Sequence, residues 1–313
     1  MFEKVLDEVR KASSVIIVGH IRPDGDCFGS QVALKELILA NFPGKKVYVT
    51  GTGLPDFFKL LGKMDKPNDD VYKDALIFVV DLNELYRIED EKAKELGTKY
   101  VLLDHHVRIE QFDFPHVSKE DAVSTSEIIC DMVFEQNLIV TEKCANALYL
   151  GILTDSGRFQ FGNDPEKIFH YCAELVKRGA KCKEIDRILA KQSIANLETK
   201  GYVLSHLVKM KKGLIYIHLT DAEIKKLGIK ASGGSGLCHN FANVVGYPIW
   251  ATFMDTETGA CIIEVRSNKY DVVDVCMKYG GGGHKKAAGV TIQNYNEEIH
   301  NQFVNDLLDL IEE

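Results

Sequence analysis

The first half of the chain contains short apolar runs that each lead into acidic or imidazole residues. Examples are VIIV before His20, LIFVV before Asp81 and YVLL before Asp104. Short apolar runs bounded by polar residues are typical of buried strands in a parallel sheet. Helical patterns alternate with these runs, which is the order expected of βαβ units. The alternation therefore predicts an α/β fold whose N-terminal domain is a parallel sheet with helices on both faces.

The polar residues after these runs form an ordered set: HxxxDxD, an isolated Asp, a DHH triplet and a further Asp. Its members are His20, Asp24, Asp26, Asp81, Asp104, His105, His106 and Asp155. In an open α/β sheet, side chains at the carboxyl ends of the strands face one crevice. A lone Asp at such a place is usually a helix N-cap, but several carboxylates cannot stay ionised together without cations. A His and Asp set without Cys suits a pair of divalent metals better than a structural zinc.

Composition narrows the class of protein. The chain has 313 residues, 45% of them hydrophobic, which is enough for two domains with separate cores. The net charge of −8 argues against binding long duplex nucleic acid, because such proteins need a basic face. Eight cysteines without a CxxC pair indicate free thiols, and no apolar run approaches the ~20 residues of a membrane span. We expect a cytoplasmic protein that does not enter a membrane.

The pattern predicts two domains joined by a helical segment. We expect a metal-binding domain over residues 1–185, a helical connector over 186–208 and a smaller α+β domain over 209–313. In the last part, Asp255–Gly259 lies between two strand-like runs and predicts a hairpin. Asn296 is placed to cap a C-terminal helix. The active site is expected in a cleft between the two domains.

A glycine-rich element, GGGGHKKAAG, occupies residues 280–289. Together with the ordered His and Asp set, it resembles the DHH phosphoesterase family with its DHHA1 domain. The resemblance covers nearly the whole chain and is strongest to the nanoRNase and pAp phosphatase branch. The stretch at 232–250 matches that family only loosely, which leaves base recognition open.

The resemblance implies specific roles for the N-terminal residues. The first metal is expected on His20, Asp24 and Asp81. The second is expected on Asp26, Asp81, His105 and Asp155, so that Asp81 bridges the two ions. The usual family cofactor is Mn²⁺. Asp104 is expected to orient a histidine, and His106 to face the substrate phosphate.

Substrate contacts are expected from both domains. Arg158 lies close after Asp155 and could neutralise phosphate charge. Four glycines before His284 could present successive N–H groups to an anion. The candidates are Arg158, Arg266, Ser267, Gly281, Gly282, Gly283 and His284. The aromatic residues Phe57, Phe58, Tyr86 and Phe159 could stack on a base, although core packing is the commoner role.

These features predict a two-metal hydrolase acting on short oligonucleotides, and on pAp, through a metal-bridging hydroxide. A phosphodiesterase for cyclic or linear signalling dinucleotides stays open, because the same residues would serve it. A family II inorganic pyrophosphatase is less favoured, since the GGGGH element belongs to a different C-terminal domain. A non-catalytic nucleotide-binding protein and a processive exonuclease are disfavoured by the complete ligand set and by the acidic charge. A homodimer is compatible with the sequence.

Overall fold

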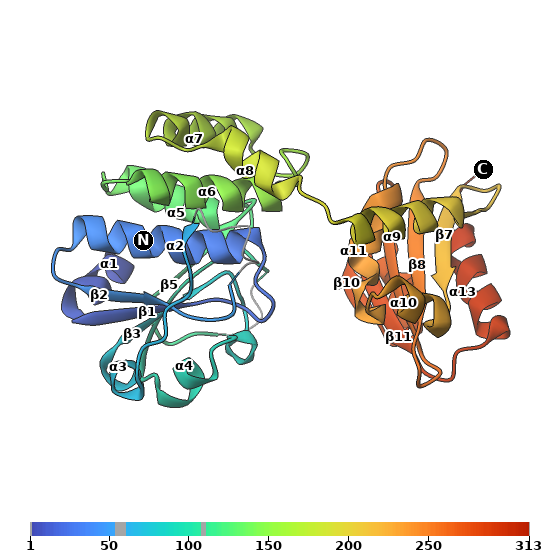
Figure 1. Ribbon diagram of the computed structural model, residues 1–313, viewed down its shortest axis with the longest axis horizontal. Helices are drawn as coiled ribbons and strands as arrows, with labels where there is room; N and C mark the ends of the chain where they lie inside the picture. The colour runs from blue at the N-terminus through green and yellow to red at the C-terminus, as the bar shows by residue number, and fades with distance from the viewer. Residues whose placement is uncertain (1, 54–60, 108–110, 313) are drawn as a thin grey trace. The chain divides into compact units, whose positions relative to one another are not determined.

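The computed structural model describes residues 2–53, 61–107 and 111–312 (Figure 1). The chain forms two compact units, Met1–Lys191 and Gln192–Glu313. Each unit has its own sheet and its own hydrophobic core, as the composition predicts. Among the described residues, no helix combines the length and the apolar character that crossing a bilayer requires.

The first unit is built on a parallel sheet. Within its described part, five strands lie in the order β2-β1-β3-β4-β5, and all neighbouring pairs are parallel. The strands are β1 (Ser14–Val18), β2 (Lys46–Val49), β3 (Leu76–Val80), β4 (Lys99–Asp104) and β5 (His116–Ser118). Every residue of β1 and β3 is buried, because helices cover both faces of the sheet. The predicted parallel α/β fold is confirmed.

Helices divide between the two faces of this sheet. Figure 1 shows α2, α5, α6 and α7 on one side and α3 and α4 on the other. The bounds are α1 (Phe2–Lys11), α2 (Gly25–Asn41), α3 (Asp69–Asp74), η2 (Leu85–Arg87), α4 (Glu91–Leu96), α5 (Thr125–Glu135), α6 (Glu142–Asp155), α7 (Pro165–Lys177) and α8 (Cys182–Leu189). The residues of α2 and α6 are mostly buried, and these helices pack closely where Gly29 meets the backbone of Ala147.

The second unit has a mixed sheet with strand order β10-β11-β9-β8-β7-β6. The β7–β8 pair is parallel and the other pairs are antiparallel. The strands are β6 (Val208–Lys209), β7 (Leu214–Leu219), β8 (Ile249–Asp255), β9 (Cys261–Ser267), β10 (Gly282–His284) and β11 (Ala287–Ile292). One face packs against α12 (Val273–Lys278) and α13 (Glu297–Asp309). The other packs against α9 (Ile194–Ser205), α10 (Asp221–Leu227) and α11 (Gly234–Cys238), with short 3-10 turns at Ala231–Gly233 and His239–Phe241.

Two local predictions for this unit are confirmed and one needs correction. β8 and β9 form the expected hairpin, and the Asn296 side chain accepts a hydrogen bond from the N–H of Ile299 at the start of α13. The connector expected over 186–208 is not one continuous helix. It is interrupted between α8 and α9, where Ser193 caps α9 by accepting the N–H of Asn196. The Ser193 cap starts a new helix because its side chain replaces the missing intrahelical acceptor.

Candidate metal centre

The ordered His and Asp set lies at the carboxyl edge of the first sheet. His20 follows β1, Asp81 follows β3 directly, and Asp104 is the last residue of β4. Asp24 is the N-cap of α2 and Asp26 lies in its first turn. Asp155 comes from a different kind of element, because it is the last residue of α6.

Four of the predicted ligands meet in one cluster. Ligand atoms of Asp26, Asp81, His105 and Asp155 all lie within 4.8 Å of one another. The His105 Nε2 atom is 3.4 Å from Asp81 Oδ1 and 3.4 Å from Asp155 Oδ2. This is the set that the resemblance implies for the second metal.

Of the two remaining predicted ligands, His20 approaches the opposite oxygen of Asp81, and Asp24 lies near His20. The His20 Nε2 atom lies 3.5 Å from Asp81 Oδ2 and 3.8 Å from Asp24 Oδ2. Asp81 therefore directs one carboxylate oxygen toward each of two imidazoles. Its backbone is left-handed, with φ of 61°, a conformation that Asp and Asn tolerate better than most residues.

Both imidazoles are held by the backbone. The Nδ1–H of His20 donates to the carbonyl of Ile21 at 3.0 Å, and that of His105 donates to the carbonyl of Ala122 at 3.3 Å. This fixes the tautomer that leaves Nε2 with a free lone pair, as in metal-bound histidines. Among the described residues, the buried His105 Nε2 has no hydrogen-bond partner. The donor set therefore fits divalent cations.

Burial and charge act together on these groups. Burial and the carboxylates of Asp81 and Asp155 raise the pKa of Asp26 well above its ordinary value. Burial and nearby carboxylates likewise raise the pKa of Asp155 to about 6. Burial opposes protonation of His105, but Asp155 and Asp81 outweigh it and raise its pKa to about 11. For Asp81, burial is outweighed by His105 and His20, which hold its pKa well below the usual range. The cluster thus takes up positive charge readily.

Helix α5 supports the centre through contacts that the sequence pattern does not reveal. The backbone N–H of Thr125 donates to Asp26 Oδ2 at 2.7 Å, and that of Ser126 donates to Oδ1 at 3.0 Å. The Thr125 hydroxyl also donates to Asp81 Oδ1 at 3.0 Å. These groups form the N-terminus of α5, where unpaired N–H groups favour negative charge. The sequence STSE marks this helix start, but it does not show which carboxylates the start would meet.

We expect Thr125→Val to weaken metal binding by roughly tenfold, because groups that orient metal ligands typically contribute 10- to 100-fold to affinity. Valine keeps the shape of threonine and removes only the hydroxyl that donates to Asp81. Calorimetric titration with a divalent metal measures the change, and Thr125→Ser, which keeps the hydroxyl, should bind like the wild type. Equal affinity in all three proteins would show that this hydrogen bond does not position Asp81.

His106, the last residue of the DHH triplet, contacts a carboxylate and not a backbone carbonyl. His106 Nδ1 lies 2.8 Å from Asp104 Oδ1, and the Asp104 side chain is buried. The His106 side chain is 35% exposed, so its other nitrogen can meet a bound molecule. Asp104 therefore orients His106, whereas the candidate ligand His105 is oriented by a backbone carbonyl.

Known protein families match the two units of the chain separately. Residues 14–152 match the N-terminal domain of the DHH family, and residues 212–313 match the DHHA1 domain. A Streptococcus mutans protein named probable bifunctional oligoribonuclease and PAP phosphatase NrnA is 32% identical over 97% of this chain and 98% of its own length. The chain belongs to the DHH family. A Bacillus subtilis member, named bifunctional oligoribonuclease and PAP phosphatase NrnA, is 28% identical over 91% of each chain. An exopolyphosphatase-related protein from Bacteroides fragilis shares the fold, with a TM-score of 0.85 at 24% identity over 100% of this chain and 97% of its own.

The predicted substrate residues of this DHH protein have other partners in the structure. Arg158 forms an ion pair with Asp186. In the DHHA1 unit, Arg266 lies 3.1 Å from Glu264 Oε2 and also donates to backbone carbonyls. The buried Ser267 hydroxyl accepts two backbone N–H groups, from Lys269 and Tyr270. The contacts of Arg266 all use its Nη1 atom, whereas the Ser267 hydroxyl has a structural role in its turn.

The glycine run of the DHHA1 unit needs a correction. The N–H of Gly280 donates to the carbonyl of Met277, and that of Gly281 donates to the carbonyl of Cys276. With Gly280 at φ of 84°, this is the hydrogen-bond pattern that ends a helix. The expected nest of successive free N–H groups is therefore wrong at Gly280 and Gly281. Gly282 and Gly283 begin β10, and His284 is exposed at its end.

The four aromatic candidates differ in their surroundings. Phe57 and Phe58 lie outside the described residues. Phe159 packs against the core of the first unit, and its ring lies 5.2 Å from that of Phe169. Tyr86 is 65% exposed, so core packing is not its role.

Proposed function

We propose that this DHH chain is a two-metal phosphoesterase that hydrolyses short oligoribonucleotides to mononucleotides and pAp to AMP. The main structural support is the position of Asp81, whose two carboxylate oxygens face two separate imidazoles. Each oxygen can serve one cation, and two adjacent cations suit phosphoryl transfer. The names of the S. mutans and B. subtilis relatives support the substrate class.

The residues divide into two candidate binding positions for the ions. His20, Asp24 and Asp81 would hold one ion, and Asp26, Asp81, His105 and Asp155 would hold the other. Imidazole and carboxylate donors suit Mn²⁺, which we propose as the native metal. When bound, such ions supply Lewis acidity and lower the pKa of water.

The chain itself contributes orientation and proton handling. Asp104 fixes the ring of His106 through Nδ1, which leaves Nε2 to hydrogen-bond a phosphoryl or leaving-group oxygen. An imidazole in this role can donate a hydrogen bond or a proton to that oxygen. Arg266 and His284 are the DHHA1 side chains proposed to bind substrate phosphates. All eight cysteines are free thiols, which fits a reducing compartment such as the cytoplasm.

A substrate panel tests the proposal. Purified protein with Mn²⁺ should release mononucleotides from a diribonucleotide and phosphate from pAp, with much slower turnover of a long RNA. Cyclic di-AMP and pyrophosphate complete the panel. Preferred turnover of cyclic di-AMP would move the assignment to a signalling phosphodiesterase, and preferred turnover of pyrophosphate would replace it with a pyrophosphatase. Inactivity on every member would refute the hydrolase assignment.

A further inference from the structure

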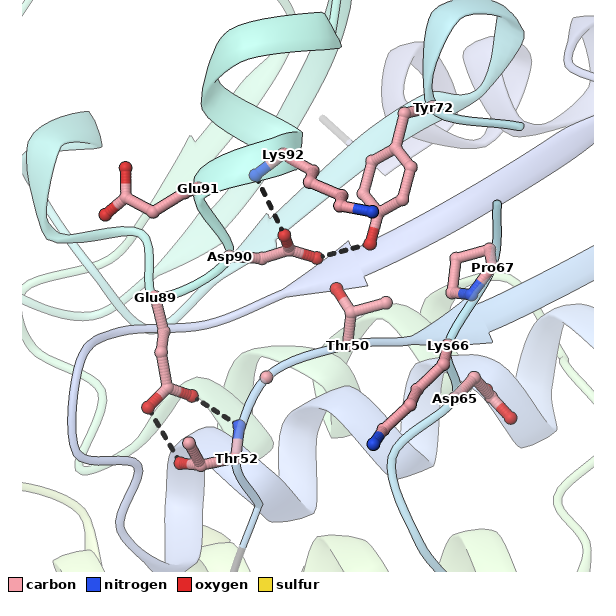
Figure 2. A pocket seen from close by; sticks show the side chains of 11 residues that line it. Thr50, Thr52, Asp65, Lys66, Pro67, Tyr72, Glu89, Asp90, Glu91 and Lys92 are labelled. Carbon is pink, nitrogen blue, oxygen red and sulfur yellow. Dashed lines mark hydrogen bonds between the residues drawn. The ribbon is translucent and has the colours of Figure 1, made fainter. Parts of the chain in front are cut away.

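A pocket of about 400 Å³ opens beyond the carboxyl end of β2, apart from the metal ligands (Figure 2). Thr50, Gly51 and Thr52 form its floor, and the segment Glu89–Lys92 forms one wall. The rings of Tyr72 and Pro67 lie on the other side of Thr50 from Glu89 (Figure 2). The volume falls within the range of small-molecule sites in proteins.

The pocket lies beside the metal centre on the same edge of the sheet. The N–H of Glu89 donates to the carbonyl of Gly19 at 3.0 Å, and Ile88 forms a β-bridge with His20. The N–H of Thr50 donates to the carbonyl of Ile17 at 3.1 Å. One wall of the pocket therefore directly follows Ile88, the residue that pairs with the metal-ligand candidate His20.

Thr50 carries a buried polar group without a partner. Its side chain is 3% exposed, and its hydroxyl has no hydrogen-bond partner among the described residues. The nearby Tyr72 hydroxyl donates its proton to Asp90 Oδ2 at 2.7 Å and therefore does not donate to Thr50. Buried hydroxyls are normally paired, so this group is set to bind a molecule that enters the pocket.

Hydrogen bonds hold the carboxylates of Glu89 and Asp90 in place in the pocket wall. Glu89 accepts the N–H and the hydroxyl of Thr52, each at 2.7 Å, and these bonds are visible in Figure 2. Asp90 accepts the hydroxyl of Tyr72 and the N–H of Lys92. Each carboxylate oxygen has a second lone pair, so the wall can accept further hydrogen bonds from a ligand without rearranging.

The charge of the lining selects the ligand. Four carboxylates line the pocket, at Asp65, Glu89, Asp90 and Glu91, against the ammonium groups of Lys66 and Lys92. This excess of negative charge disfavours a phosphate and favours hydroxyl and amino donors. The partly exposed Pro67 ring offers an apolar face to a planar ring. A ribose with a base that carries an exocyclic amino group meets all three conditions.

We propose that this pocket binds the nucleoside part of the substrate whose phosphate is held at the metal centre. The inference rests on the proposed phosphoesterase function and adds a base preference to it. Adenine, cytosine and guanine present an amino group to the acidic wall, whereas uracil does not. The pocket therefore favours ApA over UpU as a substrate.

Thr50→Val tests the pocket, with Thr50→Ser as the matched control that keeps the hydroxyl. Loss of one neutral hydrogen bond should raise the KM for ApA by roughly tenfold in the Val variant, with little change in kcat, because such a bond contributes about that factor to affinity. The Ser variant should behave like the wild type. Glu89→Gln should reduce the preference for ApA over UpU. Bis(p-nitrophenyl) phosphate, which has no nucleoside, should be turned over equally by all of these proteins.

Saturation-transfer NMR with adenosine separates failure of the pocket from failure of the proposed function. Adenosine should bind the wild type, and binding should weaken in Thr50→Val whether or not the protein hydrolyses ApA. A wild type that is inactive on ApA but binds adenosine through Thr50 would refute the function and keep the pocket. Equal effects on ApA and on bis(p-nitrophenyl) phosphate, or adenosine binding that ignores Thr50, would overturn the pocket.

Discussion

Asp81→Asn should lower kcat for dinucleotide hydrolysis by roughly 10³-fold, because about 4 kcal/mol of charge stabilisation by the ions would be lost. The buried Asp81 carboxylate faces His20 through one oxygen and His105 through the other. Asparagine replaces one of these oxygens with an amide nitrogen that cannot bind a cation. It also tolerates the left-handed backbone at this position, so the fold should persist. Steady-state kinetics and the number of metal ions bound per chain measure the effect.

Asp104→Asn is the matched control for this variant. Asp104 belongs to the same ordered set and is also buried, but its carboxylate pairs with His106, which is not a predicted metal ligand. The control should keep both metal ions and lose activity through the misplaced His106 ring. Two ions bound to Asp81→Asn with unchanged kcat would contradict the bridging role of Asp81.

Gly151→Ala should destabilise the first unit by about 2 kcal/mol, as overpacked cores typically do. A Cβ atom at Gly151, within α6, would lie 2.0 Å from Ser126 Oγ and 2.3 Å from Asp26 Oδ1. Asp26 cannot move away freely, because backbone N–H groups of α5 hold both of its oxygens. The displaced carboxylate should also weaken metal binding. Urea denaturation and metal titration test the two effects separately.

Gly201→Ala provides a control with the same chemical change. Gly201 lies within α9, and an added Cβ there would meet nothing within 4 Å. This variant should gain up to about 1 kcal/mol of stability, because alanine is the better helix former. A Gly151→Ala protein that matches the wild type in stability and metal affinity would show that α2, α5 and α6 adjust to the extra methyl group.

Several features of the fold follow from local patterns in the sequence. The buried strands β1 and β3 were predictable, because continuous apolar runs need cover on both faces. The hairpin at Asp255–Gly259 and the cap at Asn296 follow from short-range turn and capping chemistry. The prediction of free N–H groups along the glycine run was wrong at its start, because the hydrogen bonds there depend on where α12 ends. Gly280 and Gly281 are engaged by the carbonyls of that helix and are not free for an anion.

The convergence of the strand-end candidates could be predicted from the sequence, because side chains after parallel strands share one edge of the sheet, whereas Asp155 comes from the end of α6. The tertiary structure alone decided how those ligands are held. The N-terminus of α5 meets Asp26, which lies 99 residues earlier in the chain, and the segment before α4 places Glu89 beside Gly19. Such contacts depend on the path of the whole chain, whereas strand patterns and helix caps depend on neighbours a few residues away. The order of residues along the chain therefore predicts what kind of site this is. Its orienting hydrogen bonds and its adjoining pocket form only when distant segments meet in the folded chain.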